Sequence, residues 1–542
     1  MKKGILLAIL AGLLSVFVAA AAACATEDEP QTIETNVTAS TVRDDMTISV
    51  TAQAESFDGM QCTLYYGETL IESVAAAGTL SFEAPHHGIY TIRLENAEGV
   101  VKQTEAKVWA SEYRIAYFNA TLPVTMFMTS VFSDQSENLP FLAEEGGMNA
   151  DLSCKLPTYI YLERTQTFDW EQLPANAYQF PGEVDGFWED MEEAYNFIKE
   201  LYAMDSSSKF YFNFADNYTM LTALFAWGNQ IPDANYTVTA WTDGQGSYTF
   251  LNALDSTGKY TALQEQVNAK KAEFLAETPD FSELYAYVSD QYADSNGGYG
   301  AQMALVLANE TENVHYILNS TEGITWTDEA LRAKLEGVDA VALNDMLSLL
   351  KAEENAAGFR AFEFLYQTRW VDEDGREQSY SDIFAASEKP NLIILGTSVS
   401  GEAVSASQPY SFERYYTYLQ ENYGDEYDIY YKAHPSYPIT SFTDGRAEWF
   451  ERDGVVDITP AQIPVELFMF FYEDVYVCGY FGSSFYSSQD NYDGQGKDQT
   501  VCFFATQAAV LTNTTLKAMY DEGYFSSTVF LGDVMAGQSA AE

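Results

Sequence analysis

The chain has 542 residues, and its 80 Asp and Glu against 27 Lys and Arg give a formal net charge of −53 at pH 7. With 47% hydrophobic and 15% aromatic residues it can fill several cores, which excludes a largely disordered protein and predicts several domains. The acidic excess excludes nucleic acid as a partner, because no basic stripe is present to neutralise phosphates. Four histidines and no HExxH or CxxC spacing argue against a zinc enzyme, so we expect no metal.

Residues 1–23 have the pattern of an export signal. A basic start, Met1–Lys3, precedes an apolar run that ends at Cys24. The Ala-Ala-Ala-Cys sequence resembles a bacterial lipoprotein box, which predicts lipidation of Cys24 and an exposed linker over residues 24–31. No later segment is apolar for long enough to span a bilayer. We therefore expect a protein of the bacterial cell envelope, held outside the cytoplasmic membrane by a lipid anchor only; plain secretion is the alternative.

Residues 32–110 carry short alternating strands separated by turn residues, which predicts an all-β immunoglobulin-like sandwich. The expected strands are Thr47–Val50, Cys62–Tyr66, Leu80–Phe82 and Ile89–Leu94. His86 and His87 lie in a polar turn before the last of them, so we expect both side chains to be solvated. Farther along the chain, the strand-like runs around Cys478 and Cys502 predict buried free thiols.

Strands alternate with helices over residues 111–385, which predicts a Rossmann-like domain with a parallel sheet and a helical insert. The expected strands are Tyr113–Phe118, Tyr159–Leu162, Lys209–Phe214 and Tyr236–Trp241, and the expected helices between them are Val184–Ala203 and Asn217–Trp227. From Thr257 to Gln367 the pattern is mainly helical, with Leu263–Leu275 and Leu331–Ala357 the clearest helices.

A second alternation covers residues 386–510 and predicts a second Rossmann-like domain. Its expected strands are Pro390–Leu395, Tyr427–Tyr431 and Asp474–Cys478, and its expected helices are Phe412–Asn422 and Pro464–Phe471. The segment 511–542 is a candidate for a return to the first of the two domains. Each of the three strands ends in a loop of Gly, Ser, Thr, His or Lys, and open α/β sheets bind ligands at such strand ends.

Two of these loops suit a phosphate group. Phe481–Ser484 follows a strand and precedes an expected helix start, where backbone N–H groups and hydroxyls can hold an anion. A simple serine helix cap is the alternative for this loop. Lys432–Pro435 places a cation and an imidazole just past a neighbouring strand, and the two loops together favour a phosphate-bearing ligand. Asp216 and Asn217, just past an expected strand of the first domain, are further candidates for the same cleft.

The same loops carry a family resemblance. The runs Tyr430–Pro435, Ile463–Leu467 and Gly479–Ser484 resemble, in order and spacing, three motifs of the bacterial sialyltransferases of glycosyltransferase family 80: K-G-H-P, a helix with a Glu, and paired serines. Leu395–Ser398 resembles the G-T-T loop of that family, and Trp241–Tyr248 resembles its acidic–acidic–Gly motif. Several members also carry an N-terminal immunoglobulin-like domain. The chain therefore looks like a divergent member of this family.

This resemblance implies a GT-B fold of twin Rossmann-like domains, the first for the acceptor and the second for the nucleotide sugar. It implies metal-independent transfer of sialic acid from CMP-sialic acid to a galactoside acceptor, with inversion and without a further cofactor. By motif position, Ser483 and Ser484 hold the CMP phosphate and His434 stabilises the departing phosphate. Glu466 binds the ribose hydroxyls. The nucleotide pocket is further lined by Lys432, Pro435, Gly396 and Thr397.

The general base is where the sequence departs from the family pattern. The first acidic position of the motif is Thr242 here, and only the second acid remains, as Asp243. A threonine hydroxyl cannot take a proton at neutral pH, so Asp243 is our candidate for the base. The alternative is a catalytically inactive surface lipoprotein that binds a nucleotide sugar or a glycan. A purely structural surface protein fits the composition but leaves the strand-end motifs unexplained.

Overall fold

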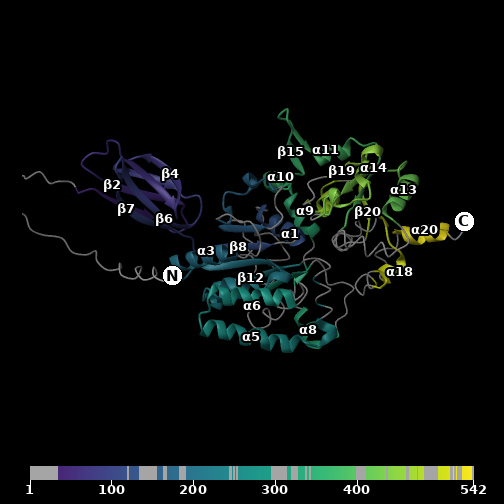
Figure 1. Cartoon of the computed structure of the whole chain (residues 1–542), viewed down its shortest axis with the longest axis horizontal. Coiled ribbons are helices and arrows are strands. Elements are labelled where there is room, and N and C mark those ends of the chain that lie inside the picture. Colours follow the sequence, from purple (N-terminus) through teal and green to yellow (C-terminus); the bar gives the residue numbers. More distant parts are fainter. Residues whose placement is uncertain are drawn as a thin grey trace, which may run out of the picture. The chain divides into compact units, whose positions relative to one another are not determined.

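The computed structural model divides into two compact units (Figure 1). The residues it describes are 34–118, 121–132, 156–162, 168–181, 191–242, 247, 251, 254–294, 314–318, 327–335, 339–340, 343–397, 411–434, 437–458, 463–472, 474–480, 499–512, 517, 520–521 and 528–539. Among the described residues, the first unit comprises those up to Ser40 with Ile48–Phe82 and Tyr90–Ala106. The second comprises Thr41–Thr47, Glu83–Ile89 and the described residues from Lys107 onward. Cys24 lies outside the described residues.

The first unit contains two β-sheets. One has the order β1-β2-β5 and the other the order β4-β3-β6-β7, with β3 antiparallel to both β4 and β6. The strands are β1 (Asn36–Thr41), β2 (Thr47–Gln53), β3 (Gln61–Tyr66), β4 (Thr69–Ala75), β5 (Thr79–Glu83), β6 (Gly88–Asn96) and β7 (Gly99–Val108). Alternate residues of β6 are buried, as period-two patterning predicts for a sheet with one face on a core. The immunoglobulin-like sandwich expected from the sequence is confirmed.

The turn that holds His86 and His87 differs from the expectation of two solvated side chains. His87 is only 2% exposed, and both its backbone N–H and its Nδ1 lie within 2.8 Å of the Tyr159 hydroxyl oxygen. The rings of Tyr113 and Tyr178 also meet the imidazole edge-on. The turn belongs to the second unit, whose aromatic strands offer the imidazole both apolar contact and a hydroxyl partner. The polarity of the turn itself carries no sign of these distant partners.

The second unit begins with a seven-stranded sheet in the order β10-β9-β8-β11-β12-β13-β14, and every neighbouring pair is parallel. Its strands are β8 (Glu112–Phe118), β9 (Thr158–Leu162), β10 (Ala177–Gln179), β11 (Lys209–Ala215), β12 (Tyr236–Trp241), β13 (Val314–Leu318) and β14 (Asp339–Ala340). β13 and β14 correct the expectation of a mainly helical stretch, because they extend the sheet beyond β12. Within the sheet, the central β11 is buried from Phe210 to Ala215, as a strand covered on both faces must be.

Helices surround this sheet, and Figure 1 shows α5, α6 and α8 grouped together. The described α-helices between Thr121 and Leu365 are α1 (Thr121–Phe132), α3 (Met191–Met204), α5 (Tyr260–Ala276), α6 (Phe281–Asp294), α8 (Glu329–Leu335), α9 (Leu343–Leu350) and α10 (Ala356–Leu365). The helix expected over Asn217–Trp227 begins as a 3₁₀ turn at Asp216–Tyr218 and ends as a π-helical turn at Ala223–Trp227. The helix expected over Leu331–Ala357 is divided between α8, β14, α9 and the start of α10.

A six-stranded sheet follows in the order β19-β18-β17-β20-β21-β22, again with parallel neighbours. Its strands are β17 (Asn391–Leu395), β18 (Asp428–Lys432), β19 (Val456–Asp457), β20 (Val475–Gly479), β21 (Thr500–Phe503) and β22 (Val529–Phe530). Both faces are covered: Leu392 and Ile394 share a core with residues of α13 (Phe412–Tyr423) and α20 (Leu531–Ser539), whereas Ile393 and Leu395 join the core of the first sheet. The two parallel sheets confirm the expected pair of Rossmann-like halves.

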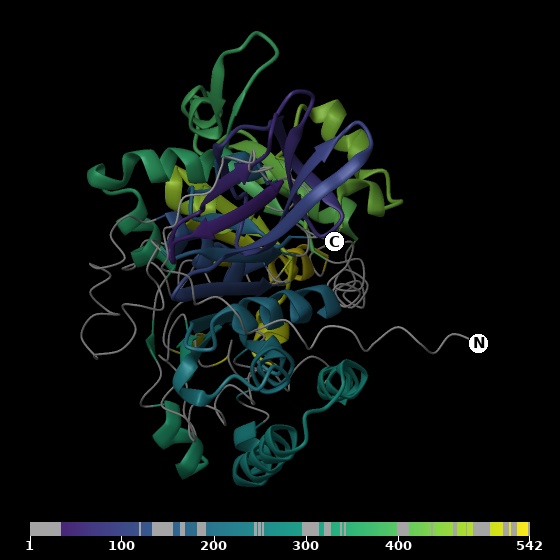
Figure 2. The same cartoon turned by 90° about the vertical axis from the view of Figure 1, so that its left-hand side faces the viewer.

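The described residues of the C-terminal segment include a strand and a helix beside the second sheet. Among its described residues, β22 pairs with β21, and the Gly532 N–H donates to the Ala505 carbonyl oxygen at 3.1 Å. Leu531 and Met535 of α20 are buried in the core of the second sheet. β22 and α20 therefore extend the second sheet and its core, and a return of the segment 511–542 to the first of these halves stays a prediction. Away from both sheets, β15 (Arg369–Val371) and β16 (Glu377–Ser379) form an antiparallel hairpin that projects from the unit (Figures 1 and 2).

Candidate functional site

Three strand ends of the second sheet lie side by side. Leu395 of β17 pairs with Lys432 of β18 on one side and with Gly479 of β20 on the other. The parallel register therefore delivers the loops that begin at Gly396, Ala433 and Tyr480 to the same edge. This edge is where an open α/β sheet binds its ligands, and the sequence placed its candidate phosphate loops here.

Two of these strand ends require glycine. A Cβ atom on Gly396 would lie 2.6 Å from the Tyr431 hydroxyl oxygen and 3.1 Å from the His434 backbone nitrogen. Gly479 has a φ of 138°, and a Cβ atom there would lie 2.6 Å from the Leu395 carbonyl oxygen. The three strand ends approach each other so closely that neither position has room for a side chain.

Lys432 is an unusual side chain for this edge because it is only 3% exposed. Its Nζ donates a hydrogen bond to the Ala433 carbonyl oxygen at 2.8 Å. Burial lowers the pKa of Lys432 to about 7, although the charges of Asp457 and Glu466 act in the opposite direction. The edge therefore contains a buried amine that titrates near neutral pH, with two carboxylates close enough to influence it.

The two carboxylates come from different elements. Asp457 ends β19, and burial raises its pKa while the charge of Lys432 lowers it. Glu466 lies in the first turn of α15 (Val465–Phe471) and is 5% exposed. Sequence reasoning missed Asp457, and the available signal was its place at the end of the short apolar run Val455–Val456. Burying Lys432 and Glu466 with a partly buried Asp457 nearby is costly unless the charges compensate one another, so the three residues mark a candidate site.

His434 is the second residue past β18 and is partly exposed. Its backbone forms an isolated bridge with Tyr437, whose N–H donates to the His434 carbonyl oxygen at 3.0 Å. The two rings are 5.2 Å apart. Thr397 follows Gly396 at the same edge. Pro435, Ser483 and Ser484, which the sequence also assigned to this site, lie outside the described residues.

The carboxyl edge of the first sheet carries a second group of polar side chains. Ala215 pairs with Trp241, so Asp216 and Thr242 occupy adjacent positions just past β11 and β12. The Tyr316 hydroxyl donates to Asp216 Oδ2 at 2.5 Å, and the Thr242 hydroxyl donates to Ser247 Oγ at 3.0 Å. Asp243, the predicted base, lies outside the described residues. Sequence reasoning missed Tyr316 because β13 stood inside a stretch interpreted as helical, although its alternating run Val314–Leu318 was a usable strand signal.

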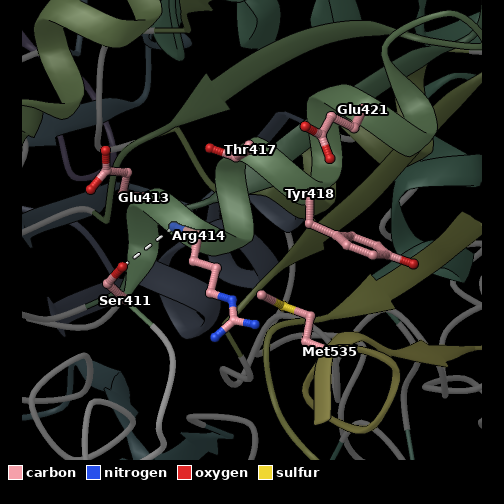
Figure 3. A pocket seen from close by; sticks show the side chains of 7 residues that line it. All are labelled: Ser411, Glu413, Arg414, Thr417, Tyr418, Glu421 and Met535. Atoms are coloured by element: carbon pink, nitrogen blue, oxygen red, sulfur yellow. Dashed lines mark hydrogen bonds between the residues drawn. The ribbon is translucent and has the colours of Figure 1, made fainter. Parts of the chain in front are cut away.

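One cavity lies away from both groups. It has a volume of about 330 Å³ and lies along the outer side of α13, where Met535 of α20 closes one side (Figure 3). Figure 3 shows Glu413, Arg414 and Glu421 around an opening lined mainly by polar and charged groups. Ligand pockets are mostly apolar with a few placed polar groups, so this cavity is a poor candidate for a small-molecule site.

Neither family models nor curated protein sequences match the chain. Solved structures do. The 2,6-sialyltransferase of Photobacterium sp. JT-ISH-224, solved in a ternary complex with the donor product CMP and the acceptor substrate lactose, matches with a TM-score of 0.51 at 14% identity, over 91% of this chain and 95% of that one. The chain has the fold of bacterial sialyltransferases. The resemblance expected from the sequence motifs is thus confirmed at the level of the fold.

Two further structures match in the same way. The match with a sialyltransferase from Photobacterium damsela covers 91% of this chain and 98% of that one, with 15% identity and a TM-score of 0.50. An α/β-galactoside α-2,3-sialyltransferase from Photobacterium phosphoreum covers 78% and 99%, with 12% identity and a TM-score of 0.50. Within the described residues, no helix is long and apolar enough to cross a bilayer. The described side chains also form no group of three or more His, Cys, Asp or Glu suited to a metal ion.

Proposed function

We propose that this protein transfers sialic acid from CMP-sialic acid to a galactoside acceptor, with inversion and without a metal ion. The observation that carries the proposal is the alignment of three strand ends at Leu395, Lys432 and Gly479. Beside them lie the buried Lys432 and Glu466 side chains and the partly buried Asp457, whose charges influence Lys432. The sialyltransferase fold supports it. The order of the motif residues in the sequence, which agrees with the resemblance, supports it as well.

In this proposal the second sheet binds the nucleotide and the first binds the acceptor. Glu466 accepts hydrogen bonds from the ribose hydroxyls, and Ser483 and Ser484 donate to the phosphate. Gly396 and Thr397 let the ligand approach the strand ends, and Lys432 and Pro435 complete the pocket wall. His434 stabilises the negative charge that develops on the phosphate as the bond to the anomeric carbon breaks. A carboxylate beside the acceptor must take up the hydroxyl proton, a role that the sequence assigns to Asp243.

Calorimetric titration with CMP tests the nucleotide site. We expect the wild type to bind CMP, and we expect binding to weaken at least tenfold in Glu466→Gln and to disappear in the double variant Ser483→Ala/Ser484→Ala. The matched control is Glu413→Gln, which changes a carboxylate in the separate cavity on α13. A folded wild type that shows no heat of binding would remove the donor site from the proposal.

A binding protein without turnover is the second candidate function. The observation that favours it is Thr242, which stands where the resemblance predicts an acid. Incubation of the wild type with CMP-sialic acid and lactose separates the two candidates. Formation of sialyllactose supports the enzyme, whereas CMP binding without product supports the binding protein.

We further propose that Cys24 is lipidated and anchors the protein to the outside of the cytoplasmic membrane. The apolar run before Cys24 and the acidic residues after it support this location. Metabolic labelling with a radioactive fatty acid should mark the wild type and leave Cys24→Ala unlabelled. Release of unlabelled wild type into the medium would instead identify the protein as secreted.

A further inference from the structure

Two residues directly follow neighbouring central strands of the first sheet. Asp216 comes after β11 and Thr242 after β12, and the pairing of Ala215 with Trp241 makes them neighbours. Phe180, after β10, is the other described residue in such a position, so Asp216 is the only acid among them. The edge that the proposed function assigns to the acceptor therefore carries a carboxylate one strand away from the position where the resemblance predicts one.

The Asp216 side chain is held firmly at this edge. It is fully buried, and its Oδ2 accepts a 2.5 Å hydrogen bond from the hydroxyl of Tyr316, which lies on β13 beyond β12. The Asp216 carbonyl oxygen accepts from the Thr219 hydroxyl at 3.1 Å, which fixes the turn that leaves β11. A short hydrogen bond to a carboxylate is strong and orients its acceptor oxygen. The backbone at the end of β11 and the Tyr316 hydroxyl on β13 thus fix the position of the Asp216 carboxylate.

Thr242 is committed to other partners. Its N–H donates to the Ile317 carbonyl oxygen at 3.1 Å, and its hydroxyl donates to Ser247 Oγ. These contacts attach the end of β12 to β13 and to the following segment. Thr242 therefore has a structural role at this edge. The residue that accepts the proton of the acceptor hydroxyl must then be a neighbouring carboxylate.

We propose that Asp216 is the general base of the transfer and that Tyr316 is its positioning residue. The proposal rests on the proposed function. The acceptor O–H bond breaks as its oxygen forms a bond to the anomeric carbon of the donor, and the proton moves to Asp216. The bond from the anomeric carbon to the phosphate oxygen of CMP breaks, and its electron pair leaves with the phosphate.

The test compares four variants of the full chain with the wild type. Asp216→Asn removes the base, Asp243→Asn removes the sequence-predicted base, and Tyr316→Phe removes the positioning hydroxyl. Asp453→Asn is the matched control, because Asp453 accepts a 2.9 Å hydrogen bond from the Tyr416 hydroxyl in the second half of the unit, away from the proposed edge. CMP affinity by calorimetry and the pH dependence of transfer from CMP-sialic acid to lactose are measured for each.

We expect Asp216→Asn to lower the transfer rate at least about 100-fold, with CMP affinity within twofold of the wild type. Tyr316→Phe should keep measurable transfer but move the acid limb of the pH–rate profile to higher pH, because the carboxylate loses a hydrogen bond that favours its charged form. Asp453→Asn should leave rate and profile unchanged. A residue with only a structural role would not move the acid limb.

Three outcomes overturn the inference. In the first, Asp216→Asn transfers at a rate within tenfold of the wild type while Asp243→Asn shows no transfer, which identifies Asp243 as the general base. The second is an unchanged acid limb in Tyr316→Phe, which decides the matter if Asp216→Asn does not fold. The third is a wild type that binds CMP but forms no product. Failure of the wild type to bind CMP at all is distinguishable from these, because it overturns the proposed donor site as well.

Discussion

The proposed role of His434 in catalysis can be measured separately from nucleotide binding. It follows β18 at the edge where three strands end, and its side chain is partly exposed while Lys432 beside it is buried. If His434 stabilises the departing phosphate, its contribution is larger in the transition state than in the complex with CMP. His434→Ala should therefore lower the rate of transfer from bound donor about 100-fold or more and change CMP affinity by less than fivefold.

Single-turnover kinetics and calorimetry on the same preparation check this split. His86→Ala is the control, because it removes another histidine at a distance from the strand ends. A loss of CMP affinity as large as the loss of rate would show that His434 only binds the nucleotide.

His87 makes the stability of the fold depend on pH. Burial lowers the pKa of His87 to about 4, against an ordinary value near 6.5 in the unfolded chain. Between these values the unfolded chain binds more protons than the folded one, so the free energy of unfolding falls as the pH falls from about 6.5 to 4. Complete traversal of this window removes about 3 kcal/mol, and above pH 7 the histidine has no effect.

The variant His87→Gln isolates this contribution. Its free energy of unfolding, measured in urea at several pH values, should fall less steeply than that of the wild type between pH 6.5 and 4, and the two curves should run parallel above pH 7. Tyr159→Phe provides the comparison, since it removes the hydroxyl partner and keeps the titrating imidazole. Parallel curves for wild type and His87→Gln over the acid window contradict the burial of a neutral His87.

At the scale of the element, the junction of β17, β18 and β20 depends on close backbone approach. Gly479→Ala places a Cβ 2.6 Å from the Leu395 carbonyl oxygen at a φ of 138°, so both the clash and the backbone conformation oppose the substitution. We expect a loss of at least about 2 kcal/mol in the free energy of unfolding. Gly537→Ala is the matched control, because a Cβ there meets nothing within 4 Å inside α20. The control should be neutral or gain up to about 1 kcal/mol. Equal stability of the two variants in urea would contradict the tight junction.

The elements also show where sequence patterns carry enough information. β17 was predictable because a strand covered on both faces is a continuous apolar run, and Leu392–Leu395 is one. β13 was not, because its five residues lie in a stretch dominated by helices, and a short apolar run fits either structure until its neighbour is known. The partner that makes β13 a strand is β12, more than seventy residues earlier in the chain.

At the scale of the whole molecule, the sequence predicted the immunoglobulin-like unit, the two parallel sheets and the sheet edges that carry the candidate site. It did not predict the side-chain contacts at those edges. Lys432 and Glu466 were recognised from motifs, whereas Asp457 lies near them only because β19 pairs with β18. Tyr316 lies near Asp216 only because β13, which the sequence did not predict, is a strand of the same sheet. His87 was misassigned because its partners lie on β8, β9 and β10. In each case the missing information was a tertiary neighbour, which local composition does not encode.

The net charge of −53 acts on the molecule as a whole. Like charges repel more strongly in the compact state than in the expanded one, so this excess of carboxylates destabilises the fold. Salt screens that repulsion, since the Debye length falls from about 30 Å at 0.01 M to about 8 Å at 0.15 M ionic strength. The melting temperature should therefore rise by several degrees between 0.01 and 0.5 M sodium chloride at pH 7.5. Sucrose is the control, because it stabilises by exclusion from the surface and should add the same increment at both salt concentrations. A melting temperature that falls with added salt would mean that local ion pairs such as Arg369 with Glu363 and Glu377, 2.8 and 2.6 Å apart, contribute more to stability than the net repulsion removes.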